Sequence, residues 1–169
     1  AAHEYAEMDD IFALAESRNE SPFIVVCDSL EDPHNLGAIL RSAEAAGVHG
    51  VIIPKRNSVT LNYTVAKTSA GAIEYVPVVK VANLPAAIDE LKSRGVWIFG
   101  ADMDGTDYTA LDYSGSIALV IGSEGKGIGR LVREKCDFIA SLPMRGKINS
   151  LNASVAAGIL MFEAAKHRN

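Results

Sequence analysis

The chain has 169 residues and a mass of 18.0 kDa; 49% of its residues are hydrophobic, 22% are charged, and its net charge is −5. This length and apolar content predict one globular domain with a sizeable core and exclude a disordered chain. The apolar runs are too short to span a bilayer, and a bare nucleic-acid-binding module would need clustered Lys and Arg. We therefore expect a soluble, cytoplasmic protein without a membrane segment.

Cysteine and histidine positions argue against a disulfide or a metal site. Cys27 and Cys136 each lie in an apolar, strand-like run, which favours buried free thiols. The histidines lack the spacing of metal ligands; they are His3, His34, His49 and His167. We expect no metal. The first residue is Ala rather than Met, and we expect the chain to be part of a longer protein.

Strands and helices are predicted to alternate along the chain. The expected strands lie at 22–29, 48–54, 73–79, 96–101, 116–122 and 137–143. The expected helices lie at 7–17, 34–47, 61–70, 83–95 and 129–136, and a last, apolar helix ends at 165. Turns are expected at 102–115, between the fourth and fifth strands. This alternation predicts an α/β fold with a mostly parallel sheet of about six strands and helices on both faces. In such sheets ligands bind at the carboxyl ends of the strands.

A glycine-rich loop follows one of these strands. Gly122, Gly125, Gly127 and Gly129 come directly after the run at 116–121, and glycines let backbone amides approach a ligand closely. The loop has neither the Gly-Lys-Ser/Thr of a phosphate loop nor the glycine spacing of the dinucleotide fingerprint. It is compatible with a nucleotide-like ligand and also with a simple tight turn.

Polar side chains follow three predicted strands at the ligand-binding edge. Asn35 and Arg41 come after the first strand, Glu124 lies in the glycine loop, and Ser150 follows the sixth strand. Taken singly, Asn35 and Ser150 are expected helix caps, Arg41 a surface cation and Glu124 a turn residue. Together they bring an arginine, a carboxylate and several amide or hydroxyl groups to one edge of the sheet.

Three segments resemble the signature motifs of a known family. They are "DPHNLGAILRSA", "LVIGSEGKGI" and "LPMRGKINSLNASVAAG", and in this order they resemble the motifs of the SpoU (TrmH-like) ribose methyltransferases, a branch of the SPOUT superfamily. The resemblance covers residues 23–169, which we assign to a SPOUT catalytic domain, with 1–22 as an N-terminal linker and helix. It is strongest to bacterial enzymes that methylate a guanosine ribose in 23S ribosomal RNA, whose upstream RNA-binding domain we expect to be missing here.

The resemblance implies a cofactor, a knot and a set of site residues. S-adenosylmethionine would bind in a deep C-terminal trefoil knot, which general connection rules would not predict. The implied cofactor-binding residues are Thr68, Gly71, Gly100, Ala101, Ile121, Gly122, Ser123, Gly125, Leu142, Met144, Ser150, Leu151 and Asn152. The implied catalytic residues are Asn35, Arg41, Glu124, Ser150 and Asn152. Ser150 would both cap the last helix and line the pocket, while Asn149 and Asn152 would face the ligand.

The implied reaction is methylation of a ribose 2′-hydroxyl in RNA. Because the sulfonium is already a good leaving group, the enzyme must chiefly align the attack and help remove a proton. In such enzymes Arg41 would be either the proton acceptor or a clamp on the RNA phosphate, and we favour the clamp because arginine normally stays protonated. The family also implies a homodimer, with the apolar last helix as a candidate contact.

Three alternatives remain open. A tRNA ribose methyltransferase of the same family would carry the same motifs, and so would a catalytically inactive RNA-binding relative that binds S-adenosylmethionine without turnover. A dinucleotide-dependent enzyme would need a proper glycine fingerprint after the first strand, which residues 28–35 do not supply.

Overall fold

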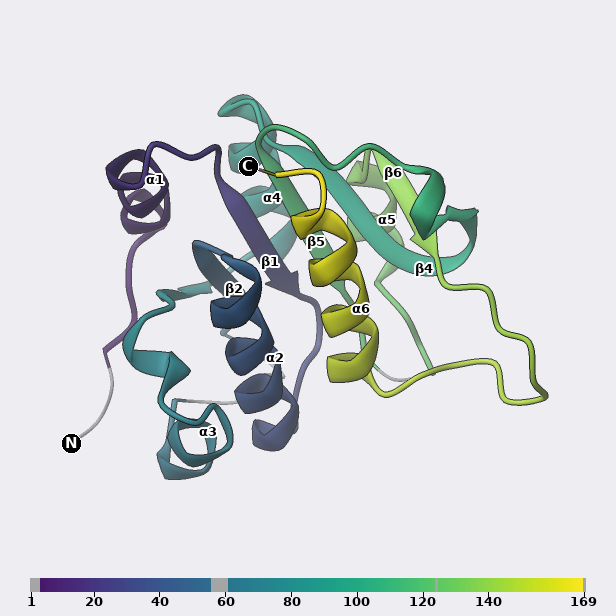
Figure 1. Cartoon of the computed structure of the whole chain (residues 1–169), viewed down its shortest axis with the longest axis horizontal. Coiled ribbons are helices and arrows are strands. Elements are labelled where there is room, and N and C mark those ends of the chain that lie inside the picture. The colour runs from purple at the N-terminus through teal and green to yellow at the C-terminus, as the bar shows by residue number, and fades with distance from the viewer. Residues whose placement is uncertain (1–3, 56–60, 124, 169) are drawn as a thin grey trace.

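A parallel β-sheet forms the middle layer of the protein, shown in the computed structural model of Figure 1. The structure describes residues 4–55, 61–123 and 125–168. In this part of the chain the six strands are β1 (Phe23–Cys27), β2 (Gly50–Pro54), β3 (Val78–Val81), β4 (Trp97–Asp107), β5 (Ile117–Ile121) and β6 (Phe138–Ser141). Their order in the sheet is β3-β2-β1-β5-β4-β6, and every pairing is parallel. The predicted α/β class and the sheet are confirmed.

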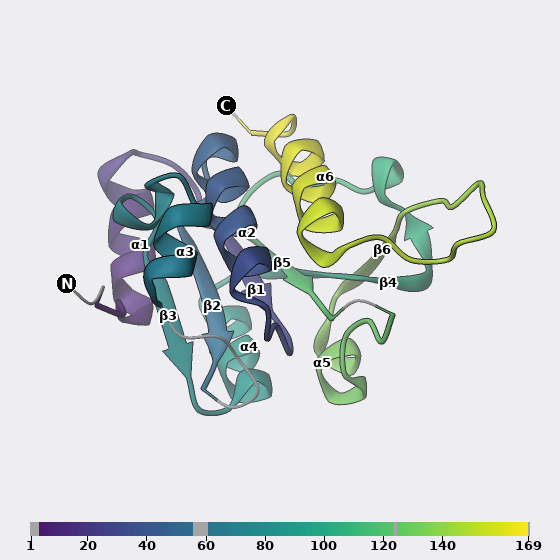
Figure 2. The ribbon, with the colours of Figure 1, turned by 90° about the horizontal axis from the view of Figure 1, so that it is seen from below.

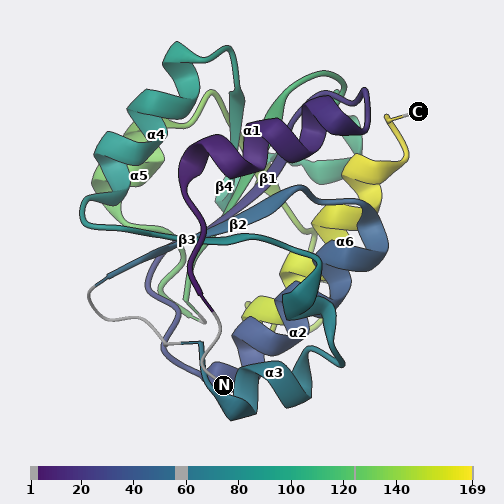
Figure 3. The same cartoon turned by 90° about the vertical axis from the view of Figure 1, so that its left-hand side faces the viewer.

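Helices cover both faces of the sheet, as Figure 3 shows edge-on. One layer contains α2 (Pro33–Ala46), α3 (Tyr63–Thr68) and α6 (Ala153–Ala165), and the other contains α1 (Met8–Ser17), α4 (Leu84–Ser93) and α5 (Arg130–Lys135). Two short 3-10 helices, Ala72–Glu74 and Tyr108–Ala110, complete the elements of the described residues. None of these helices has the length and apolar character needed to cross a membrane.

The apolar runs of the strands are unbroken because each strand contributes side chains to two hydrophobic cores, one on each face of the sheet. Phe23, Val25 and Cys27 of β1 face the layer of α2 and α6, whereas Ile24 and Val26 face the layer of α1 and α4. All five side chains are buried. This alternation is the reason why the sequence shows unbroken apolar runs instead of alternating polar positions.

Two helix starts differ from the expected ones. The cap of α2 is Asp32, whose side chain accepts a hydrogen bond from the backbone N–H of His34, and Pro33 occupies the first turn. Asn35 therefore lies inside the helix instead of capping it. The cap of α6 is Asn152, whose Oδ1 accepts from Ser154 N–H at 2.9 Å, so Ser150 precedes the helix and does not cap it.

The N-terminal segment packs against the sheet. Ile11 and Ala15 of α1 are buried, and a Cβ placed on Gly50 of β2 would come within 2.3 Å of Ile11 Cγ1. Ala6 also bridges Val79 in parallel, along the outer edge of β3. The part of residues 1–22 that the structure describes therefore packs on the sheet, with α1 in the same layer as α4 and α5.

Strand β4 is longer than the sequence predicts. It continues through Asp107, and β6 pairs with it twice, because Ala140 lies opposite both Ala101 and Thr106. The residues between these two contact points bulge out of the sheet. The region 102–107, expected to be turns, is therefore strand with a bulge, held by pairing to β6 rather than by local residue preference.

Candidate functional site

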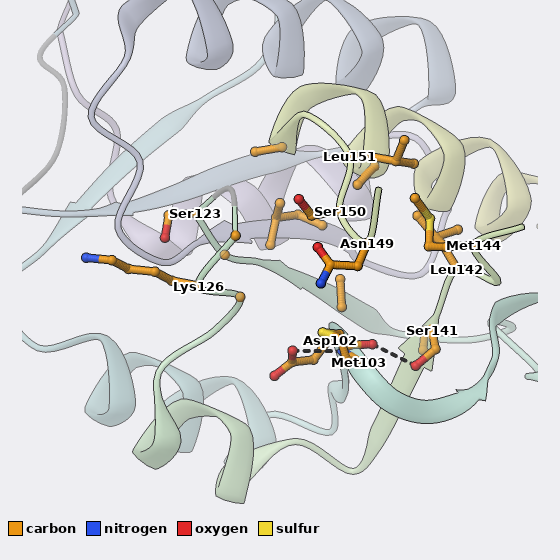
Figure 4. Close-up of a pocket in the computed structure, with 18 of the residues that line it drawn as sticks. Asp102, Met103, Ser123, Lys126, Ser141, Leu142, Met144, Asn149, Ser150 and Leu151 are labelled. Carbon is orange, nitrogen blue, oxygen red and sulfur yellow. Dashed lines mark hydrogen bonds between the residues drawn. The ribbon is translucent and has the colours of Figure 1, made fainter. Parts of the chain in front are cut away.

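A pocket of about 390 Å³ lies at the carboxyl ends of β4, β5 and β6, beside the start of α6 (Figure 4). We call it the inner pocket. It is lined by residues 101–104, 121–123, 125–127, 140–142, 144, 149–151, 153 and 156. It lies where ligands bind in open parallel sheets, beyond the carboxyl ends of the strands.

The glycine loop after β5 forms one wall of the inner pocket. Gly127 N–H donates to Ser123 O at 3.0 Å, closing the loop on itself. A Cβ on Gly122 would lie 2.1 Å from Gly127 O, so only glycine permits this approach. Gly125 and Gly127 have φ values of 78° and 67°, in the left-handed region that glycine adopts most readily. The glycines thus fix the path of the backbone around the pocket.

The bulge of β4 forms the floor of the inner pocket. Ser141 Oγ accepts a hydrogen bond from Gly105 N–H and donates one to Asp102 O, both at 2.7 Å. Asp102 Oδ2 also lies 2.7 Å from Arg133 Nη1 of α5, and a Cβ on Gly127 would approach Asp102 Oδ1 to 2.7 Å. The bulge is therefore tied to β6, to α5 and to the glycine loop at once.

The segment between β6 and α6 closes the opposite side. Figure 4 shows the side chains of Asn149 and Ser150 between the glycine loop and the apolar side chains of Leu142 and Met144. Leu151 adds apolar surface beside them. The inner pocket thus joins an apolar region to a group of hydrogen-bonding side chains, the combination expected of a small-molecule site.

A second hollow, of about 510 Å³, adjoins the first; we call it the outer cleft. It is lined by residues 29–32, 35, 123, 126–129 and 153, from the loop after β1, the start of α2 and the glycine loop. Ser123, Lys126, Gly127 and Ala153 line both spaces. The two cavities therefore share one wall, made of two small residues and two polar ones.

Comparison with known proteins places this site in a family. The model of the SpoU rRNA Methylase family matches residues 22–162. The chain belongs to the SpoU rRNA methylase family. A Bacillus subtilis (strain 168) protein assigned by name to the TrmH family of tRNA/rRNA methyltransferases is 57% identical over 170 residues, a match that covers all of this chain and 68% of that protein. The chain is thus an RNA methyltransferase of the TrmH type.

Solved structures agree with this assignment. The SpoU methyltransferase AviRb from Streptomyces viridochromogenes, in complex with the cofactor AdoMet, is 29% identical, with a TM-score of 0.85 over 96% of this chain and 65% of that one. An AdoMet-bound rRNA methyltransferase from Sinorhizobium meliloti is 28% identical, with a TM-score of 0.84 over 98% of this chain and 62% of that one. The chain therefore spans somewhat under two thirds of these two solved chains.

Most of the implied cofactor residues of this SpoU family member surround one space. The inner pocket is lined by Ala101, Ile121, Gly122, Ser123, Gly125, Leu142, Met144, Ser150 and Leu151. Asn149 joins them, whereas Asn152 caps α6 and does not line the pocket. Gly100 lies buried just outside it, where a Cβ would meet Cys136 Sγ at 2.7 Å.

The structure does not bring Thr68 and Gly71 to the inner pocket. A Cβ on Gly37 of α2 would lie 1.7 Å from Thr68 Oγ1, so Thr68 packs tightly against that helix. The Thr68 hydroxyl donates to Thr64 O at 2.7 Å, and Gly71, at φ 90°, begins the turn that follows α3. Thr68 thus lies between α3 and α2, and neither residue is among those that line the inner pocket.

The implied catalytic residues are spread over both cavities. Asn35 lines the outer cleft and Ser150 lines the inner pocket. Arg41 is exposed on α2 and lines neither cavity; at 1.5 Å per helical residue it lies about 9 Å along the axis from Asn35. Glu124 lies outside the described residues. Of the described catalytic candidates, Asn35 and Ser150 thus line adjoining cavities and Arg41 lines neither.

Several lining residues were missed by the sequence analysis. Asp102 and Ser141 meet at the floor through the bulge of β4, and Lys126 stands between the two cavities. The position of Asp102 and Ser141 at strand ends was the available signal, since strand carboxyl ends collect ligand-binding groups. Their mutual contacts depend on β4–β6 pairing, which the sequence does not reveal.

Neither cysteine is a candidate nucleophile. Burial, followed by the nearby charge of Asp28, raises the pKa of the Cys27 thiol to about 12. Burial, followed by Asp137, raises the pKa of the Cys136 thiol to about 11, and its Sγ donates to Val132 O at 3.3 Å. Both thiols are therefore protonated at neutral pH, and the thiolate is the reactive form. Among the described residues no His, Cys, Asp and Glu side chains gather as metal ligands would.

Proposed function

We propose that this chain transfers a methyl group from S-adenosylmethionine to a ribose 2′-hydroxyl of RNA. The observation that carries the proposal is the pair of adjoining cavities, which share Ser123, Lys126, Gly127 and Ala153. Direct transfer between two molecules requires that both be held side by side in a fixed orientation. The AdoMet complexes of the related SpoU enzymes support the inner pocket as the donor site.

The inner pocket suits S-adenosylmethionine in size and in lining. Its volume of about 390 Å³ lies within the roughly 300–1,000 Å³ of small-molecule sites. Leu142, Met144 and Leu151 offer apolar surface to a planar base, and Asn149 and Ser150 offer hydrogen-bonding groups to the polar parts. When bound, the cofactor supplies an electrophilic methyl group on a sulfonium, which leaves as a neutral thioether.

We further propose that the C-terminal part of the chain forms the deep trefoil knot implied by its family resemblance. The connections that would take part are those that follow β4, β5 and β6, and the same connections line the inner pocket. A knot would prevent these segments from separating without unthreading the chain. Its benefit would be a donor site held in shape before the cofactor arrives.

In the reaction the ribose oxygen attacks the methyl carbon in line with the departing sulfur. With the cofactor bound, the oxygen–carbon bond would form as the carbon–sulfur bond breaks, and the hydroxyl proton would pass to water, because arginine normally stays protonated and is a poor base. We assign Asn35, in the outer cleft, to orienting the acceptor, and Arg41 to clamping an RNA phosphate. The Arg41 guanidinium has no hydrogen bond or ion pair within the described residues, so it is available for this contact. Glu124, Ser150 and Asn152 would order the loops around them.

A homodimer would complete this arrangement. Helix α6 is apolar apart from Ser154 and Glu163, and Val155 and Phe162 are 50% and 51% exposed although the helix also packs against α2. Ile148, just before the helix, is 77% exposed. Exposed apolar surface of this kind marks an interface. Because Arg41 lies on α2 beside α6, a second copy on this face would bring a second site within its reach.

The acceptor that we favour is a guanosine of 23S ribosomal RNA. The support is the similarity of the motif regions to the ribosomal enzymes and the SpoU rRNA Methylase family match. A tRNA acceptor is the alternative, because the B. subtilis relative is named for both RNA classes. We place the activity in the cytoplasm, where free thiols such as Cys27 and Cys136 persist.

The experiment pairs donor binding with methyl transfer. Calorimetry with S-adenosylmethionine and with NAD should show binding of the former alone. Radiolabelled transfer to unmodified transcripts of 23S ribosomal RNA and of tRNA, followed by mapping of the labelled nucleotide, identifies the acceptor. Donor binding without transfer to either transcript would favour an inactive RNA-binding relative, and NAD binding without donor binding would overturn the proposal.

Arg41→Ala tests the clamp. We expect methyl transfer to be abolished while donor affinity stays unchanged, because the guanidinium lies outside the inner pocket. Arg41→Lys should retain part of the activity, since it keeps the charge but loses the planar fork. Arg18→Ala, at an exposed position after α1, is the control and should behave as wild type. If Arg41→Ala transfers the methyl group at the wild-type rate, Arg41 is only a surface cation and the clamp assignment is wrong.

A further inference from the structure

We propose that the outer cleft binds the acceptor nucleotide in one orientation, with its phosphate on Lys126 and its base toward Glu31. This inference rests on the proposed function and extends it, because it assigns the acceptor subsite and its polarity. Three observations carry it: the wall shared with the inner pocket, the exposure of Lys126, and the origin of the positive and negative lining side chains from two different loops.

The shared wall determines where the methyl group must cross. Gly127 and Ala153 line both spaces, so no bulky side chain separates the two cavities at these residues. The reactive hydroxyl of an acceptor in the outer cleft would therefore face this wall. In RNA the 2′-hydroxyl neighbours the 3′-phosphate on the same sugar, so that phosphate must also lie close to the wall.

Lys126 is placed to receive this phosphate. Its side chain lines both cavities, is exposed, and has no hydrogen bond or ion pair within the described residues. In Figure 4 it extends along the glycine loop away from Asn149 and Ser150 in the inner pocket. An ammonium group beside the transfer point offers charge-assisted hydrogen bonds to a phosphate.

The end of the outer cleft formed by the loop after β1 is acidic. Among the described lining residues the charged ones besides Lys126 are Glu31 and Asp32. One oxygen of Asp32 is used to cap α2, whereas the exposed Glu31 carboxylate has no hydrogen bond or ion pair within the described part of the chain. Carboxylates repel phosphate and only accept hydrogen bonds, so this end would face base edges that carry N–H donors.

The two ends together determine the orientation. A nucleotide with its phosphate at Glu31 would place like charges together and leave Lys126 without a partner, whereas the reverse placement satisfies both. The carboxylate end should also prefer guanine, whose edge presents N1–H and an amino group side by side, over uracil, whose edge presents one N–H between two carbonyl oxygens. Asn35, which lines the same cleft, can donate and accept and therefore suits either base.

The test is a titration followed by NMR of the isotope-labelled chain, with and without S-adenosylhomocysteine. The probes are guanosine 3′-monophosphate and uridine 3′-monophosphate. We expect saturable shifts of backbone amides at residues 29–35 and 125–129, with tighter binding of the guanosine probe. Shifts confined to other surfaces, or no saturable shifts, would overturn the inference.

Three variants separate the parts of the inference. Lys126→Ala should weaken both probes by about fivefold or more, and Glu31→Gln should reduce the preference for guanosine over uridine by about threefold. Arg130→Ala is the matched control, because Arg130 follows the glycine loop, is exposed, and lines neither cavity. Equal losses in Lys126→Ala and Arg130→Ala would mean only general charge attraction and would overturn the assignment of Lys126.

The same titration distinguishes this inference from the proposed function. Shifts at residues 121–123 and 149–151 on addition of S-adenosylhomocysteine report on the donor site. If they are absent, the proposed function fails, while the nucleotide titration of the unloaded chain still decides whether the outer cleft binds in the stated orientation. If they are present and the nucleotide probes do not bind, only the acceptor assignment fails.

Discussion

The inner pocket and the outer cleft adjoin, yet they are built in different ways. The inner pocket depends on close backbone approaches: a Cβ on Gly122 would lie 2.1 Å from Gly127 O, and one on Gly105 would lie 2.4 Å from Ile139 O. The charged side chains that line the outer cleft, among them Glu31 and Lys126 on two different loops, are exposed. A change at Gly122 or Gly105 alters the path of the chain, whereas a change at Glu31 or Lys126 alters the charge of an exposed side chain. Such a division would let one fold keep its methyl donor while its acceptor changes.

The largest effect that would separate the two regions is expected from Gly122→Ala. The added Cβ would force the glycine loop apart, since its nearest neighbour is backbone and cannot rotate away. We expect affinity for S-adenosylhomocysteine to fall more than about tenfold, measured by calorimetry. Gly146→Ala is the control, because nothing lies within 4 Å of its Cβ position. If Gly122→Ala binds S-adenosylhomocysteine as tightly as wild type, the glycine loop can adapt to the added Cβ. The proposed difference between the inner pocket and the outer cleft would then be wrong.

Ser141→Ala tests the floor of the inner pocket. The variant loses the hydrogen bond from Gly105 N–H and the one to Asp102 O, whereas the pairing of Thr106 and Asp107 with β6 remains. We expect the free energy of unfolding to fall by about 1–2 kcal/mol in urea titrations, together with weaker donor binding. Ser17→Ala removes only a surface bond to Leu14 O and should stay within about 0.5 kcal/mol of wild type.

Substitutions of Asn152 and Ser150 distinguish two roles within one loop, capping of α6 and lining of the inner pocket. Asn152→Ala removes the cap of α6 and should cost about 1 kcal/mol of stability, with an indirect loss of donor affinity as the preceding loop loosens. Ser150→Ala, at a residue that lines the inner pocket without capping, should leave stability unchanged and weaken donor binding directly. Thermal unfolding and calorimetry on both variants check this; a stability loss in Ser150→Ala would contradict the assignment of the cap.

The smallest effect is expected far from both cavities, at the amino ends of the strands. His49 is buried; its Nδ1 accepts from Phe23 N–H and its Nε2 lies 2.8 Å from Glu20 Oε1. Burial lowers the pKa of His49, an effect that its bond to Glu20 partly opposes. The unfolded chain therefore takes up a proton first, so stability is full above about pH 6.5 and is lost as the pH falls through the folded-state pKa.

His49→Asn checks this sign, because its amide oxygen can still accept from Phe23 N–H. Urea titrations between neutral and mildly acidic pH should show a smaller decline for His49→Asn than for wild type, while donor affinity stays the same. A decline of equal size in both proteins would assign the acid sensitivity to other groups.

The sheet could be predicted from the sequence because its determinants are local. The strand at 117–121 is an unbroken apolar run bounded by turn residues, and burial on both faces requires such a run. Gly47 at the end of α2 adopts φ 85°, as a terminal glycine predicts. Asp32 followed by Pro33 was the better cap signal for α2 than Asn35, since proline favours the first helical turn.

The site was less predictable because it depends on contacts between distant segments. Asp102 reaches Arg133 and Ser141 only after β6 pairs with the far end of β4. The extension of β4 to Asp107 contradicts the turn-rich composition of that region because strand pairing overrides local preference. Motif resemblance identified the glycine loop and the segment before α6. Lys126, by contrast, becomes a candidate site residue only because the structure shows that it lines both cavities.

The central place of β5 in the sheet has a consequence for how the chain folds. Strands β1, β2 and β3 can pair as soon as the first half of the chain is available, but β1 has β5 as its other neighbour, with Phe23 opposite Ile117. Figure 2 shows β5 between β1 and β4. During synthesis the inner edge of β1 must therefore wait, unpaired, until more than half of the chain has been made. Such an edge is a template for aggregation, and a chain that stops before β5 should need a chaperone to remain in solution.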